Sequence, residues 1–141
     1  MKVALERINN DYLFEVSNDN GHRVFLDNKT KETGSVKGIS PMELLLMGLA
    51  GCSSIDVVAI LNKQKINPTS LKMEVMGFRP EGIVPRLFKE IEVHVFLEGD
   101  FSPEKAKRAV ALSFEKYCSV SKTLEHTATI THKVFLNGKE V

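Results

Sequence analysis

The chain has no excess of charge of either sign, because its 19 basic and 18 acidic residues leave a formal net charge of only +1. The two signs are intermixed, so the sequence offers no basic footprint for a nucleic acid or for an anionic membrane surface. An apolar fraction of 43% and a charged fraction of 26% are those of an ordinary folded protein. We therefore expect a single domain over residues 1–141, with neither a nucleic-acid nor a membrane partner.

The N-terminus lacks the continuous apolar core of a signal peptide, since residues 1–14 alternate apolar and polar side chains. Cysteine is scarce as well: Cys52 and Cys118 are the two in the sequence. Two cysteines without an export signal predict a reducing, cytoplasmic location. Free thiols or a transient redox pair are then favoured over a permanent structural disulfide.

Several familiar catalytic motifs are missing. There is no CxxC, and the four histidines form no ligand pattern, so we expect no metal. There is no glycine-rich phosphate loop, and Ser53 and Ser54 lack the Gly-x-Ser-x-Gly frame of a nucleophile elbow. The two cysteines are therefore the main candidates for chemistry in this chain.

A long apolar helix is predicted over residues 40–65. Ser40 is a suitable N-cap, and Glu43 three residues later completes a capping box. Residues 44–61 are apolar or small on all sides of the helix, although Asp56 and two serines interrupt a run of nearly membrane-spanning length. A soluble helix of this kind must be buried all round.

The rest of the chain predicts short strands and a second, amphipathic helix. Strands are expected over residues 2–8, 12–16, 22–27, 71–79, 87–97 and 127–136. The second helix begins at Ser102-Pro103 and carries a stripe of Ala106, Ala109, Val110, Ser113 and Tyr117. A further helical turn is expected at 120–125, and 28–38 reads as an exposed loop. The order βββαββαβ predicts an α+β domain with one largely antiparallel, six-stranded sheet.

A single sheet covers only one side of the central helix. The other side then needs a second cover, and a second copy of the chain is the economical one. The apolar pattern therefore predicts a homodimer in which the two central helices meet.

Each cysteine has an inert interpretation and a functional one. Taken alone, Cys52 favours inert core packing, because free cysteine is commonly a small buried hydrophobe. Cys118 has Lys116 and Lys122 nearby, and a helical turn from residue 120 would offer unpaired N–H groups. Both effects favour a thiolate, although a helix-end cysteine without a role is the alternative. Nothing in the spacing of the two cysteines says whether they touch.

Four segments occur in an order that resembles the OsmC/Ohr superfamily of osmotically inducible and organic-hydroperoxide-resistance proteins, in particular its uncharacterised OsmC-like branch. They are NGHRVFLD, SPMELLLMGLAGCSSIDVV, PRLFKEIEVHV and EKYCSV. The resemblance implies an OsmC-like fold and an intertwined homodimer with its central helices back to back. It also implies a cysteine-based peroxidase, an oxidoreductase of the oxidative stress response that uses no metal or haem.

Carried over by position, Cys52 would be the peroxidatic thiol and Cys118 the resolving thiol. The resemblance then implies a small-molecule organic hydroperoxide as substrate and an external dithiol as reductant. Two other readings stay open. One is a non-catalytic, small-molecule-binding dimer with packing cysteines, and the other is a dithiol redox sensor.

A buried thiol also needs a cation nearby in order to ionise. The family uses an arginine from the N-terminal strands and a glutamate directly after the helix proline. Here that position is Met42, and Glu43 lies one residue further along. Arg23 and Arg86 are the candidate cations. Asp56, one helical turn after Cys52, is expected to raise the thiol pKa unless it is paired.

Overall fold

The alternating N-terminal segment forms a three-stranded antiparallel sheet in the computed structural model, which describes residues 1–29 and 34–141. Its strands are β1 (Val3–Arg7), β2 (Phe14–Asn18) and β3 (Arg23–Leu26), paired in that order. The Oδ1 atoms of Asn9 and Asn18 accept backbone N–H groups of the two turns. The predicted N-terminal meander is therefore confirmed.

The chain forms two compact units, Met1–Leu45 and Leu46–Val141. The boundary between them falls inside the first helix, near its N-terminus. Residues 34–37 of the predicted loop are exposed, whereas its residues 30–33 lie outside the described part of the chain. A single domain over residues 1–141 stays a prediction.

The second unit has a four-stranded sheet of its own. Its strands are β4 (Ser70–Phe78), β5 (Glu90–Glu98), β6 (Thr129–Leu136) and β7 (Lys139–Glu140), in that order. β4 pairs with β5 and β6 with β7 in antiparallel fashion, but β5 and β6 are parallel. The α+β class is confirmed, whereas the expectation of one six-stranded sheet is wrong. A parallel pair needs a long crossover connection, and the helices between β5 and β6 supply it.

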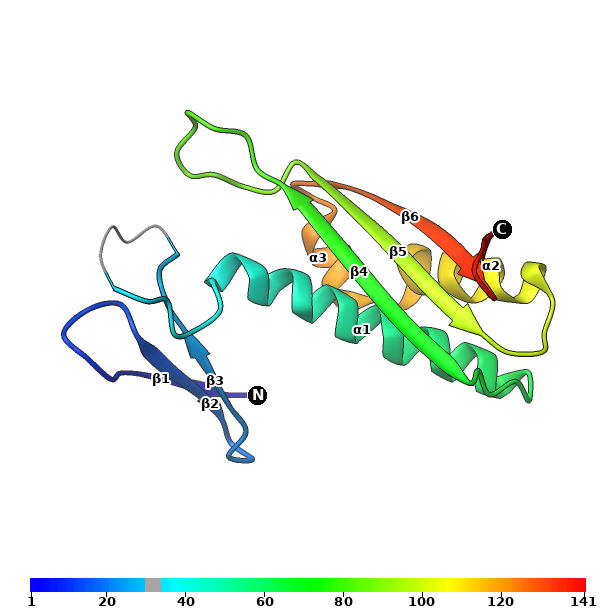
Figure 1. Ribbon diagram of the computed structural model, residues 1–141, viewed down its shortest axis with the longest axis horizontal. Helices are drawn as coiled ribbons and strands as arrows, with labels where there is room; N and C mark the ends of the chain where they lie inside the picture. Colours follow the sequence, from blue (N-terminus) through cyan, green and yellow to red (C-terminus); the bar gives the residue numbers. More distant parts are fainter. Residues whose placement is uncertain (30–33) are drawn as a thin grey trace. The chain divides into compact units, whose positions relative to one another are not determined.

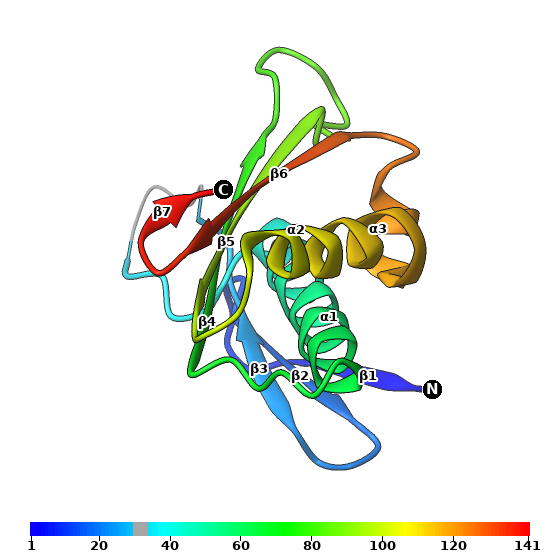
Figure 2. The ribbon, with the colours of Figure 1, turned by 90° about the vertical axis from the view of Figure 1, so that its right-hand side faces the viewer.

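One face of the four-stranded sheet carries the core of this unit. Alternate residues of β5 are at most 1% exposed, as its sequence pattern predicts: Ile91, Val93, Val95 and Leu97. Figures 1 and 2 show all three helices on one side of this sheet.

The first helix, α1 (Pro41–Lys63), begins with the predicted capping box. Ser40 Oγ accepts the Met42 N–H at 3.2 Å, and Glu43 accepts the Ser40 N–H at 3.0 Å. Glu43 also forms an ion pair with Lys29. The Lys29 hydrogen bond, followed by that from Ser40, lowers the pKa of Glu43 below its ordinary value.

Only one stripe of α1 is buried within the chain. It consists of Leu49, Ser53, Val57 and Leu61, spaced four residues apart. The opposite face, which we call the open face, consists of Gly48, Gly51, Ile55 and Ala59, all exposed, and Ile55 keeps 71% of its surface. The sequence predicts that α1 is buried on all sides, but a single chain buries only one side of it. By length and composition α1 could also cross a membrane, a test that core helices of soluble proteins pass too.

The second predicted helix is divided. It comprises α2 (Pro103–Leu112) and a π-helical turn, η1 (Ser113–Tyr117), in which the Cys118 N–H bonds the Ser113 carbonyl at 2.8 Å. The wider turn shifts the face that later residues present. Tyr117 is consequently 48% exposed, so its placement on the buried stripe is wrong. The short helical turn predicted at 120–125 is confirmed as α3 (Ser119–Leu124).

A close approach at Gly77 gives a test of this packing. A Cβ at Gly77 would lie 2.4 Å from the Phe88 ring and 3.1 Å from a Leu46 methyl. We expect Gly77→Ala to lower the free energy of unfolding by about 1–3 kcal/mol, measured by denaturant titration. In a Phe88→Leu background, the same substitution should cost clearly less. An equal cost in both backgrounds would contradict the packing of Phe88 on this glycine.

Candidate functional site

Three side chains from two distant parts of the chain converge in the second unit. The Cys52 and Cys118 sulfurs and an Asp56 carboxylate oxygen all lie within 4.8 Å of one another. Both thiols are free. The fold thus brings together two cysteines that are 66 positions apart.

α1 supplies Cys52 and Asp56, which lie four residues apart and hence on one side of the helix. At 100° per residue, both positions fall between the buried stripe and the open face. Each of them is accordingly half-buried. Cys52 is therefore accessible from the edge of the open face, while it stays in contact with the interior.

Ser113, the first residue of η1, ties the crossover helices to α1. Its hydroxyl lies 3.3 Å from the Ser53 carbonyl oxygen and 3.4 Å from Asp56 Oδ2, so it can donate to either acceptor. Its own carbonyl accepts the Cys118 N–H. A single fully buried serine therefore contacts α1 through its hydroxyl and the turn that leads to Cys118 through its carbonyl.

Cys118 is the N-cap residue of α3, and its sulfur accepts the Ser121 N–H at 3.3 Å. Its side chain has no exposed surface. Burial, together with the neighbouring Cys52 and Asp56, raises the pKa of the Cys118 thiol to about 11, although the Ser121 N–H acts in the opposite direction.

The expectation that Cys118 favours the thiolate is therefore wrong in sign. The helix-start N–H acts as predicted, but desolvation outweighs it. The two lysines have other contacts: the Lys116 ammonium lies over the Tyr117 ring, and Lys122 pairs with Glu125 at 2.9 Å.

Arg23, Arg86 and Glu43, which the resemblance suggests as supporting residues for Cys52, make contacts of their own. Arg23 pairs with Glu15 at 3.1 Å within the first unit. Arg86 donates to the carbonyls of Pro80 and Arg79 at 3.1 Å. Glu43 caps α1, as described above. Their roles beside Cys52 stay predictions.

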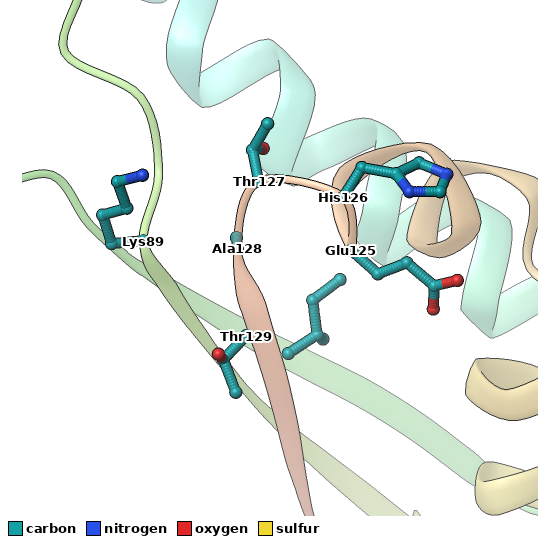
Figure 3. A pocket seen from close by; sticks show the side chains of 7 residues that line it. Lys89, Glu125, His126, Thr127, Ala128 and Thr129 are labelled. Carbon is teal, nitrogen blue, oxygen red and sulfur yellow. The ribbon is translucent and has the colours of Figure 1, made fainter.

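A pocket of about 690 Å³ lies elsewhere, where β5 and β6 begin. It is lined by Lys89, Glu125, His126, Thr127, Ala128, Thr129 and Ile130. Figure 3 shows Lys89 on one side of the chain entering β6 and Glu125 and His126 on the other. These polar groups do not converge on one point, so this pocket is a weaker candidate than the cysteine pair.

A second groove, of about 550 Å³, lies between α1 and α2 and carries both apolar and charged side chains. Ile60, Leu112 and Tyr117 provide its apolar surface, while Lys63 and Arg108 are two of its charged residues. Ile60 follows Asp56 by one helical turn, and Tyr117 directly precedes Cys118. Two residues that line the groove are therefore close in sequence to residues of the cysteine cluster.

Sequence reasoning missed the parts played by Ser113 and Ser121. Ser113 was on the predicted buried stripe, and a hydroxyl at a buried position needs a partner. That rule could have drawn attention to it. No feature of the sequence indicated that the Ser121 N–H would donate to the Cys118 sulfur, because that hydrogen bond depends on the residue at which α3 begins.

Comparison with known proteins gives consistent matches. The family described as OsmC-like protein matches residues 33–133. Protein YhfA of Escherichia coli K12 is 41% identical over 113 residues, which cover 79% of this chain and 81% of YhfA. A hypothetical protein from Aquifex aeolicus superposes with a TM-score of 0.80 at 30% identity, covering 96% of each chain. The organic hydroperoxide resistance protein OhrB of Bacillus subtilis superposes with a TM-score of 0.69 at 18% identity, and the match covers 96% of each chain.

The electrostatics of Cys118 can be tested by titration of the reduced protein. We expect its thiol to titrate near pH 11, followed through the Cβ chemical shifts of isotope-labelled cysteine. Cys52→Ser and Asp56→Asn should each lower that pKa, because each removes a group that raises it. Asp100→Asn, at an exposed carboxylate, should leave it unchanged. A Cys118 pKa near the ordinary thiol value in the unaltered protein would contradict this account.

Proposed function

Because this chain belongs to the OsmC-like protein family, we propose that it is a thiol-dependent peroxidase that reduces organic hydroperoxides. Cys52 is the peroxidatic thiol and Cys118 the resolving thiol. One observation carries the proposal: two free thiols, one half-buried and one fully buried, lie within 4.8 Å of each other.

The bonds that form and break in the proposed reaction involve the two sulfurs, the hydroperoxide and an external reductant. The Cys52 thiolate attacks the terminal oxygen of the hydroperoxide, the O–O bond breaks, and the alkoxide takes a proton and leaves as an alcohol. Cys52 is now a sulfenic acid. The Cys118 sulfur attacks it, the S–O bond breaks, and water leaves as the disulfide forms. A cytoplasmic dithiol then returns two electrons and two protons by exchange.

The unequal burial of the thiols supports this assignment of roles. The oxidant must reach the attacking sulfur, and Cys52 has exposed surface whereas Cys118 has none. Burial also raises the pKa of the Cys118 thiol, so both its inaccessibility and its protonation favour Cys52 as the sulfur that meets the oxidant.

The groove between α1 and α2 would favour a substrate with an organic tail. Ile60, Leu112 and Tyr117 offer apolar surface there, and Tyr117 directly precedes Cys118 in the sequence. Burying an organic tail there adds binding energy that hydrogen peroxide cannot gain. The likeness to OhrB, a protein named for organic hydroperoxide resistance, supports the same substrate class through the shared fold.

We also propose that two copies pair through the open face of α1. That face is apolar, and its glycines have no neighbours within 4 Å that a Cβ would meet. A second helix could therefore approach closely. The pairing would cover Ile55 and would close the edge of the site at Cys52.

Turnover gives the test of the proposed activity. With cumene hydroperoxide and a dithiol, we expect Cys52→Ser to lose about 1,000-fold or more in rate, because the remaining thiol, Cys118, is fully buried and out of reach of the oxidant. Without dithiol, Cys118→Ser should release one equivalent of alcohol and retain a Cys52 sulfenic acid instead of a disulfide. Ser54→Ala, which removes a hydroxyl from the same helix, should keep the rate. Undiminished turnover in Cys52→Ser would contradict the assignment.

The proposed dimer can be tested by sedimentation. We expect the unaltered chain to sediment as a dimer at micromolar concentration and Ile55→Asp as a monomer. The reason is that an unpaired carboxylate buried between helices costs several kcal/mol. Ile55→Val should remain dimeric. A monomeric unaltered chain would contradict the pairing.

A further inference from the structure

The cysteine cluster has the composition of a metal site as well as that of a redox pair. Two thiols and one carboxylate lie with their ligand atoms within 4.8 Å of one another. A tetrahedral zinc ion with Zn–S distances near 2.3 Å places its sulfur ligands about 3.8 Å apart. Small side-chain rotations would therefore bring all three atoms into the first coordination sphere of one ion.

The backbone arrangement suits a shared ion. Cys52 and Asp56 lie at i and i+4 of α1, the same helical spacing that lets the two histidines of HExxH bind one zinc. Cys118 approaches from the start of α3, a separate element. Two ligands on one helix face approach an ion from one side only. A third ligand from a separate element allows the ion to be surrounded.

The surrounding hydrogen bonds orient two of the three ligands. The Ser121 N–H bonds the Cys118 sulfur at 3.3 Å. The Ser113 hydroxyl lies 3.4 Å from Asp56 Oδ2. Metal sites commonly have such outer contacts, which fix the ligands and tune their affinity.

We propose that Cys52, Asp56 and Cys118 form a site for one Zn²⁺ ion per chain, with the fourth position open to water. The two thiols release their protons to solvent as they bind, and no electrons are exchanged. Half-buried Cys52 leaves a path for the water ligand. Sequence spacing could not indicate this site, because Cys118 is 66 positions from Cys52.

The site does not depend on the proposed peroxidase activity, but the two would compete for the same sulfurs. A zinc-bound Cys52 cannot attack a hydroperoxide, and two zinc-bound thiolates cannot form a disulfide. Bound zinc would thus protect both thiols from oxidation and hold the chain in an inactive state.

The test is zinc titration of the reduced, chelator-stripped full chain against a chromophoric chelator. We expect one zinc per chain, about 100-fold weaker binding in Cys52→Ser and in Cys118→Ser, and about 10-fold weaker binding in Asp56→Asn. Asp100→Asn should match the unaltered chain. Co²⁺ should give thiolate charge-transfer bands and tetrahedral d–d bands that both cysteine variants lose.

Two outcomes would overturn the zinc site: less than one zinc per chain, or equal affinity in the Cys52→Ser, Cys118→Ser double variant. Hydroperoxide turnover is measured separately, with chelator present. A chain that binds zinc but turns over no hydroperoxide would contradict the peroxidase alone. A chain that turns over hydroperoxide but binds no zinc would contradict only the metal site.

Discussion

The contact that the site depends on is the one between Ser113 and α1. The Ser113 hydroxyl reaches the Ser53 carbonyl and Asp56, while its carbonyl accepts the Cys118 N–H. One residue therefore joins the crossover between β5 and β6 to the central helix. Ser113 thus links the turn that leads to Cys118 with the helix that carries Cys52.

Burial then makes the two thiols unequal. Cys118 has no exposed surface, and this burial is the main cause that raises the pKa of its thiol to about 11. Cys52 lies at the edge of a helix face that one chain leaves open. The same asymmetry suits a peroxidase, in which one thiol meets the oxidant and the other waits. The same burial is compatible with a bound metal cation, because the cation's positive charge stabilises a thiolate that would be unfavourable in a buried position without it.

Much of the fold could be predicted from local patterns. The capping box at Ser40 and Glu43, the alternation along β5 and the helix start at Pro103 are all encoded by neighbouring residues. The parallel pairing of β5 with β6 could not be predicted, because it depends on a crossover whose path no local pattern specifies. The exposure of Tyr117 was missed because the π-turn shifts the helical phase. The direction of the Cys118 pKa shift was mispredicted. Nearby lysines are visible in the sequence, whereas the burial of the thiol, which dominates the shift, is known only from the fold.

The central claim is that Cys52 and Cys118 of one chain act as a pair. It is tested most directly by adding one equivalent of cumene hydroperoxide to the reduced, metal-free chain and mapping the products by peptide mass spectrometry. The account predicts one intramolecular disulfide between Cys52 and Cys118, with one equivalent of alcohol released. Cys52 recovered as sulfinic acid with Cys118 still a free thiol would contradict it.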